Sequence, residues 1–143
     1  MLNSTNKFRD TGLLLLRIGV GVIFMTIHGY PKISGGPERW AGLGSSMSNL
    51  GINFFPEFWG FMSAFTEFIV PIFLILGFLY RPATLLLAIN MVVALSTHFI
   101  KLDPWGRIAY PLVLLILFIS LFLIGPGRYS IDEYLSRRKL KNK

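Results

Sequence analysis

The chain has no cysteine and little charge of either sign. The absence of cysteine from all 143 residues excludes disulfides, thiolate metal sites and cysteine nucleophiles. Charged residues make up only 15% of the sequence, a smaller share than a soluble domain carries. Hydrophobic residues make up 53%, and the mean hydropathy is +0.60. This composition indicates an integral membrane protein.

Four apolar segments are long enough to cross a bilayer, whose ~30 Å hydrocarbon core needs ~20 helical residues. We therefore expect an all-α fold, an antiparallel four-helix bundle with spans at about residues 11–30, 57–79, 82–100 and 108–124. In the long connection between the first two spans, Trp40, Leu43 and Met47 recur at helical spacing. This spacing predicts an interfacial or half-inserted helix there. We expect residues 1–135 to form a single transmembrane domain, followed by a basic tail over 136–143.

Lysine and arginine are unevenly divided between the two sides of the expected bundle. The side with both termini and the turn between spans two and three carries nine: Lys7, Arg9, Arg81, Arg128, Arg137, Arg138, Lys139, Lys141 and Lys143. The opposite loops carry four: Lys32, Arg39, Lys101 and Arg107. The positive-inside rule then predicts that both termini are cytoplasmic. The net charge of +7 suits anionic lipid head groups, and the basic tail lacks the interleaved aromatics of a nucleic-acid binder.

Polar side chains interrupt these apolar spans or lie near their ends. An ionisable group at membrane depth costs about 2.5–3.5 kcal/mol on insertion scales, so it usually pairs with a neighbour or marks a functional site. From the ~1.5 Å rise per helical residue we expect a polar column with Arg17 below, Glu67 central and two histidines above. This column should open beneath the long loop. The candidate site comprises Arg17, His28, Lys32, Glu67, Asn90 and His98.

Three interpretations of this column stay open. In the first, Arg17 and Glu67 form a purely structural ion pair that fixes helix register.

In the second, the column is a proton-handling or quinone head-group site. A histidine would donate to a quinone carbonyl, and Glu67 would exchange the coupled proton. Four phenylalanines would wall this pocket: Phe24, Phe61, Phe65 and Phe68.

In the third, a haem is held between His28 and His98, which lie at similar heights. The sequence has no paired-histidine zinc motif and no glycine-rich phosphate loop. We therefore expect no metal site and no intrinsic cofactor, with quinone as the candidate ligand.

Several stretches of the sequence resemble the DoxX family of small bacterial membrane proteins. They are Leu15–Gly21, His28–Lys32, Gly36–Gly44, Phe58–Phe61 followed by Glu67, Leu76–Pro82 and Leu123–Asp132. The resemblance covers about residues 13–135 and implies a four-helix inner-membrane protein. Where related sequences tend to have a glycine pair after the glutamate, this chain has Phe68-Ile69-Val70-Pro71.

The family is named for a relative of a subunit associated with thiosulfate:quinone oxidoreduction. The resemblance therefore implies a quinone-linked redox or proton-handling subunit that acts with partner proteins. If the protein takes part in catalysis, we expect it to be at most one subunit of a quinone-linked oxidoreductase. The alternative is a non-catalytic scaffold or assembly subunit of a larger membrane complex. Fold is the stronger of these expectations, because one fold supports many functions.

Overall fold

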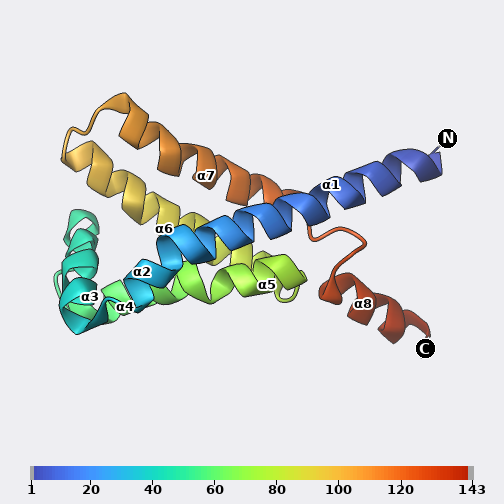
Figure 1. The fold of residues 1–143 in the computed structure, drawn as a ribbon, viewed down its shortest axis with the longest axis horizontal. Helices are drawn as coiled ribbons and strands as arrows, with labels where there is room; N and C mark the ends of the chain where they lie inside the picture. Colours follow the sequence, from blue (N-terminus) through green and yellow to red (C-terminus); the bar gives the residue numbers. More distant parts are fainter. Residues whose placement is uncertain (1, 142–143) are drawn as a thin grey trace.

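The computed structural model describes residues 2–141, and this part of the chain is all-helical, as predicted. Its elements are α1 (Leu2–Ile23), the π-helix η1 (Phe24–Gly29), α2 (Tyr30–Ile33), α3 (Gly36–Gly44), the 3₁₀-helix η2 (Ser45–Leu50), α4 (Pro56–Phe68), α5 (Val70–Leu76), α6 (Tyr80–Ile100), α7 (Trp105–Ile124) and α8 (Ile131–Lys141). Figure 1 shows the long helices running between two ends of the molecule. Both termini lie at one end, here called the termini end. The α3 helix and the α6–α7 connection lie at the other, the loop end.

Four helical stretches are long and apolar enough to cross a membrane, which confirms the predicted number of spans. They are Lys7–Ile33, Pro56–Leu76, Tyr80–Ile100 and Trp105–Ile124, with mean hydropathies of 1.8, 1.8, 1.9 and 2.5. Large apolar side chains on their outer faces, such as Ile116 and Leu123, are 58% and 71% exposed. A bilayer covers such faces, so the chain is a multi-pass membrane protein.

The second span ends earlier than the sequence predicts. It stops at Leu76 rather than near residue 79, because Gly77 adopts a left-handed conformation with φ 63° and closes the helix. The next helix then starts at Tyr80, two residues before the predicted Pro82.

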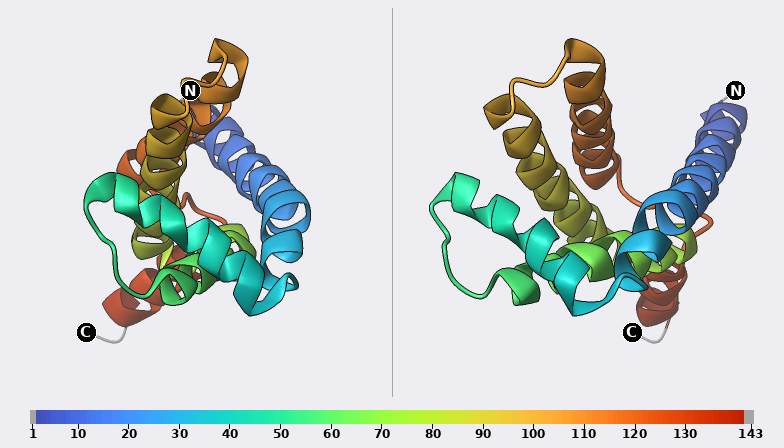
Figure 2. Two further views of the ribbon diagram at one scale, coloured as in Figure 1. Left: turned by 90° about the vertical axis from the view of Figure 1, so that its left-hand side faces the viewer. Right: turned by 60° about the vertical axis from the view of Figure 1, so that its left-hand side comes forward.

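The second span packs against α1 and η1 on one side and against α6 on the other, while α6 packs along α7. Figure 2 shows α1 and the α6–α7 hairpin on opposite sides of α4 and α5. Leu74, Leu87 and Phe118, from three different spans, are completely buried between these helices. Phe24 on η1 meets the ring of Phe118 edge to face, with centroids 5.6 Å apart. These contacts join all four spans into one core.

The long connection after the first span contains the predicted helix, α3, which packs closely on α4. Glycines allow this approach. A Cβ on Gly44 would overlap the Pro56 carbonyl, and one on Gly60 would overlap the Trp40 carbonyl. The loop-end half of α4 is therefore covered by α3. The end of the first span, η1 and α2, packs on α4, with Gly29 at Glu67, whereas α1 packs on α5. This arrangement positions the site described below.

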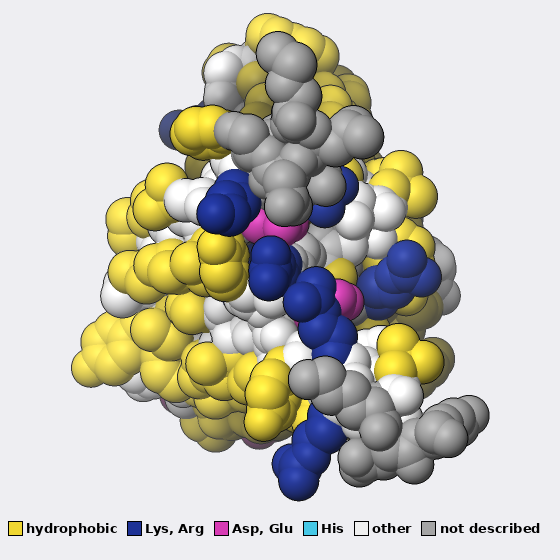
Figure 3. Space-filling view, turned by 90° about the vertical axis from the view of Figure 1, so that its right-hand side faces the viewer, with side chains coloured by type: hydrophobic (Ala, Val, Ile, Leu, Met, Phe, Trp, Pro, Cys, Tyr) yellow, Lys and Arg dark blue, Asp and Glu magenta, His cyan; other side chains and the backbone are white. Residues whose placement is uncertain are grey.

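The last helix, α8, is fixed to the turn between the second and third spans. The Asp132 carboxylate accepts hydrogen bonds from the backbone N–H groups of Leu79 and Tyr80, at 3.0 and 2.9 Å, and so caps the start of α6. The N–H of Asp132 donates to the Gly77 carbonyl. Figure 3 views this termini end, where Lys and Arg side chains gather between hydrophobic flanks. The predicted basic tail reaches Lys143, and residues 142–143 lie outside the described range.

Candidate functional site

The site is centred on Glu67, in the last turn of α4, whose side chain is only 3% exposed. Its Oε1 atom lies 2.6 Å from Nζ of Lys32 on α2 and accepts a second hydrogen bond, also 2.6 Å, from Nδ2 of Asn90 on α6. Three spans therefore meet at one carboxylate oxygen. The two donors at this distance are one ammonium group and one neutral amide, and hydrogen bonds with a charged partner are the stronger kind.

A break in the second span makes this meeting geometrically feasible. Pro71 has no N–H, so it leaves the Glu67 carbonyl without its usual helical hydrogen bond, and the span divides into α4 and α5 at Ile69. Gly29 packs directly on this carbonyl, where any Cβ would overlap it. The close approach of Gly29 brings Lys32, three residues further on, to the level of Glu67.

The Lys32–Glu67–Asn90 cluster lies in the wall of a pocket of about 320 Å³. The pocket lies between α4 and α6 and is covered by α3 and η2, beneath the long loop. Its other polar lining residues are Ser46, Ser63, Thr66, Thr97 and His98, and its apolar ones include Leu43, Met47, Trp59, Met62, Leu86, Ile89 and Val93. It is a largely apolar chamber with one buried ionic group, a combination typical of small-molecule sites.

Two polar atoms in this wall are buried without a hydrogen-bond partner. They are Oε2 of Glu67 and Nε1 of Trp59. Buried polar groups in native proteins are almost always paired, with protein, water or ligand. Both residues line the pocket, but these two atoms are buried rather than exposed to it.

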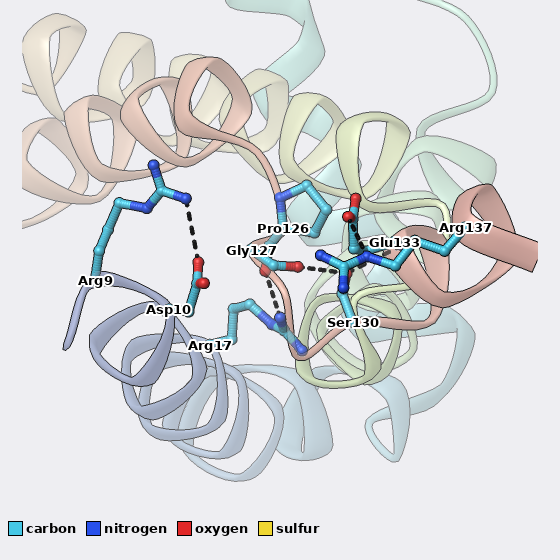
Figure 4. A network of polar contacts seen from close by, with 8 residues as sticks. All are labelled: Arg9, Asp10, Arg17, Pro126, Gly127, Ser130, Glu133 and Arg137. Carbon is cyan, nitrogen blue, oxygen red and sulfur yellow. Dashed lines mark hydrogen bonds and ion pairs between the residues drawn. The ribbon is translucent and has the colours of Figure 1, made fainter. Parts of the chain in front are cut away.

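Arg17 does not reach Glu67, so the predicted ion pair between them is wrong. Its guanidinium instead donates to four backbone carbonyls, those of Leu74, Ile75, Pro126 and Tyr129, at 2.5–3.1 Å. Figure 4 shows the side chain pointing at the loop that follows α7. These carbonyls belong to the end of α5 and to residues 126–129, where no following helical turn supplies N–H donors. Arg17 ties the termini end together and lies outside the pocket.

The two histidines serve different partners. His28 shares a 2.5 Å hydrogen bond with the Tyr110 hydroxyl on α7, stacks near Phe24 and does not line the pocket. His98 does line it, and its Nδ1–H donates to Oδ2 of Asp103 at 2.7 Å. Within residues 2–141, no group of three or more His, Cys, Asp or Glu side chains could hold a metal ion.

Asp103 lies in the α6–α7 connection, outside the spans. The hydrogen bond from His98 holds the pKa of its carboxyl below the usual value, and the nearby Arg107 guanidinium acts in the same direction, against partial desolvation. The His98–Asp103 pair thus links the pocket wall to a charged group at the loop end.

The predicted phenylalanine wall is also wrong. The pocket lining contains none of Phe24, Phe61, Phe65 and Phe68. Its aromatic member is Trp59, which the sequence argument missed. The i, i+4, i+8 spacing of Trp59, Ser63 and Glu67 places them along one face of α4 and is the signal that could have found it. Leu43 of α3, Met47 of η2 and Met62 of α4 also line the pocket, because the long loop folds over this face, and α6 supplies the opposite wall.

Comparison with known proteins agrees with this architecture. The chain is 28% identical over 134 residues to the "Putative oxidoreductase CatD" of Bacillus subtilis (strain 168), covering 94% of each chain. No solved structure matches. The DoxX family model matches residues 12–100, a segment that runs from the first span to the end of the third and contains Lys32, Glu67 and Asn90. This protein belongs to the DoxX family.

Proposed function

We propose that this protein is a quinone-linked redox or proton-handling subunit whose head-group site is the pocket beside Glu67. The observation that carries the proposal is a buried carboxylate, held by Lys32 and Asn90, in the wall of a largely apolar chamber. A pair that served helix register alone would not need this chamber. A carboxylate and an ammonium within 2.6 Å can exchange a proton with a bound ring oxygen.

The lipid-facing side of the pocket supports a membrane-dissolved ligand. Leu86 and Ile89 line the pocket and are also 43% and 51% exposed on the outer face of α6. A ring with an apolar tail could enter between α4 and α6 and leave its tail in the bilayer. A water-soluble substrate entering by this route would first have to pass the apolar side chains of Leu86 and Ile89.

The proposal also covers a redox partner protein and the orientation of the chain in the membrane. The relative from Bacillus subtilis is named a putative oxidoreductase, and we extend this to the present chain as a redox subunit. Because we assign the chain no redox centre of its own, electrons would pass to or from a partner protein. By the positive-inside rule, the termini end would face the cytoplasm across the bacterial inner membrane.

The test is quinone retention. Protein purified in mild detergent is extracted with organic solvent, and quinone is measured per mole of protein for wild type, Glu67→Gln and Asn90→Leu. We expect at least a tenfold loss of quinone in both variants. Glu57→Gln is the matched control, since it makes the same change on an exposed residue of α4 and should retain quinone.

Thermal unfolding of each variant establishes that the bundle remains folded. Equal quinone content in wild type, Glu67→Gln and Asn90→Leu would contradict the proposal. A different result would be a stoichiometric protein partner that co-purifies with both wild type and Glu67→Gln while no quinone does. The scaffold function would then replace the quinone-linked one.

A further inference from the structure

The last helix, α8, is fixed at its first turn and has no partner along the rest of its length. The Ser130 hydroxyl accepts a hydrogen bond from the N–H of Glu133 at 3.2 Å and caps the helix, while Asp132 binds the turn before α6. Within residues 2–141, no other helix packs along α8. Figure 1 shows it projecting from the termini end, away from the four spans. The fold therefore sets where α8 begins and leaves its outer surface uncovered.

An apolar stripe follows this uncovered surface. Ile131, Tyr134 and Leu135 stand at positions i, i+3 and i+4, so they share one face of the helix. Their side chains are 37%, 64% and 40% exposed. Leu140 is also exposed but lies on another face. Three neighbouring apolar side chains on a helix that no other helix covers require a partner outside the chain.

Basic side chains continue and border the stripe. Arg138 occupies its next position, i+7, and Arg137 and Lys139 lie on its two sides; all three are exposed. The acidic residues of α8 are already bound, Asp132 to backbone N–H groups and Glu133 to Arg137 at 2.7 Å. Arg138 and Lys139 have no acidic partner within residues 2–141. The stripe is therefore rimmed by uncompensated positive charge.

Two further exposed arginines lie at the base of α8. Arg81 follows Tyr80, whose N–H binds the Asp132 carboxylate, and its guanidinium carbon lies 5.8 Å from the centre of the Phe122 ring. Arg128 lies in the short segment that leads into α8. Figure 3 shows Lys and Arg side chains gathered across this end of the molecule, between hydrophobic flanks. A bilayer covers those flanks, so the basic group lies at the level of the lipid head groups.

We propose that α8 is an interfacial helix that docks on anionic lipid head groups at the termini end. The stripe of Ile131, Tyr134 and Leu135 enters the head-group layer, and the basic side chains on its borders bind lipid phosphates. An anionic bilayer supplies both the apolar depth and the negative charge that this face lacks, and it already lies beside the helix. This docking goes beyond the proposed redox function and does not depend on which ligand occupies the pocket.

The absence of cysteine allows clean single-cysteine probes of α8. Leu135→Cys lies in the stripe and Ser136→Cys lies on the opposite face, and each is labelled with a nitrobenzoxadiazole fluorophore. Quenching by acrylamide is measured in nanodiscs that hold one protein, made of phosphatidylcholine alone or with one third phosphatidylglycerol. We expect the label at residue 135 to be quenched about threefold less in the anionic discs. The label at residue 136 should be quenched equally in both lipids.

Salt and charge variants identify the cause of this protection. At about 1 M salt the Debye length falls to about 3 Å, so the difference between the two lipids should disappear. It should also disappear, in the Leu135→Cys background, when three basic residues of α8 are neutralised: Arg137→Gln, Arg138→Gln and Lys139→Gln. The matched control removes the same charge from three exposed basic residues near the loop end and should keep the difference: Arg39→Gln, Lys101→Gln and Arg107→Gln.

A label-free measurement accompanies the quenching. Trypsin should cleave unlabelled wild type after Arg137 and Arg138 more slowly in anionic discs than in phosphatidylcholine discs. Equal quenching at residue 135 in both lipids, together with equal cleavage, overturns the proposal. Protection that persists in the α8 charge variant also overturns it, because charge is then not what α8 recognises. Protection found only in discs that hold two proteins overturns it in favour of a second copy of the chain as the partner.

Discussion

Nζ of Lys32 lies 2.6 Å from Oε1 of Glu67, which joins the end of the first span to the middle of the second. The carboxylate is almost fully buried, while the lysine side chain keeps 23% of its surface exposed. Within apolar surroundings, each group compensates the charge of the other. The pair therefore holds α2 against α4.

Removing one member of this pair should destabilise the protein more than removing both. Lys32→Met leaves an uncompensated carboxylate, and we expect a loss of about 3 kcal/mol, the lower end of the range for buried pairs, because the lysine is partly exposed. The double variant Lys32→Met/Glu67→Gln should recover most of this loss. Denaturant unfolding in detergent micelles measures the free energies. Equal losses in the single and double variants would show that the charge is compensated elsewhere.

Arg17 should be essential for stability and unimportant for ligand retention. Lysine has three donors on one nitrogen and cannot match the planar fork that reaches four carbonyls, so Arg17→Lys should cost about 3 kcal/mol. The same substitution at the exposed Arg81 is the control and should have little effect. Quinone content per folded molecule should match wild type in both variants. A selective loss of quinone in Arg17→Lys would place this residue in the functional site.

The close packing of α3 on α4 should be sensitive to a single methyl group. Gly44→Ala places a Cβ on the Pro56 carbonyl and forces the two helices apart, at an expected cost of about 1–3 kcal/mol. Gly42→Ala on the same helix meets nothing within 4 Å and should be neutral or slightly stabilising. Thermal unfolding distinguishes them. Similar melting temperatures for the two variants would mean that α3 shifts without cost.

Asp132 should hold α8 to the bundle. Asp132→Ala leaves the N–H groups of Leu79 and Tyr80 without their cap, and we expect a loss of about 1–2 kcal/mol. Trypsin cleavage after Arg137 and Arg138 should become faster, since α8 is released. Glu133→Gln removes only an exposed pair with Arg137 and should change cleavage little. Unchanged cleavage in Asp132→Ala would show that α8 is held by other contacts.

Asp103 should contribute a pH-dependent stabilisation at the loop end. Its folded-state pKa is depressed, chiefly by the His98 hydrogen bond, below the unfolded value of about 3.9. The contribution is therefore present in full above that unfolded value and is lost as the pH falls through the folded pKa. Wild type should melt at a higher temperature than Asp103→Asn at pH 6, and the difference should shrink as the pH is lowered below the unfolded-state pKa of the Asp103 carboxyl. A difference that grows on acidification would contradict the assigned direction.

The sequence by itself determined the spans, because hydropathy is a property of local composition. Glu67 and Asn90 could be singled out for the same reason, since a polar group in an apolar run is visible without a fold. The glycines and Pro71 could be recognised as sites of helix approach or helix breaking. The groups that these glycines pack against could not be predicted, because they belong to residues far away in the chain.

Only the tertiary structure decided which polar groups meet. Counting the rise along each helix of an antiparallel bundle placed Arg17 next to Glu67. In the structure, however, α3 covers the first half of α4, the end of the first span (η1 and α2) meets α4 at Glu67, and α1 packs on α5. This offset brings Lys32 to the carboxylate and leaves Arg17 at backbone carbonyls, which no sequence pattern reveals as partners. The pocket wall, with Trp59 in place of the predicted phenylalanines, follows from the same folding of the loop over α4. Hydropathy is a property of consecutive residues, so the sequence alone reveals the spans. Which polar side chains pair depends on which helix faces meet, and the packing of distant segments determines those faces.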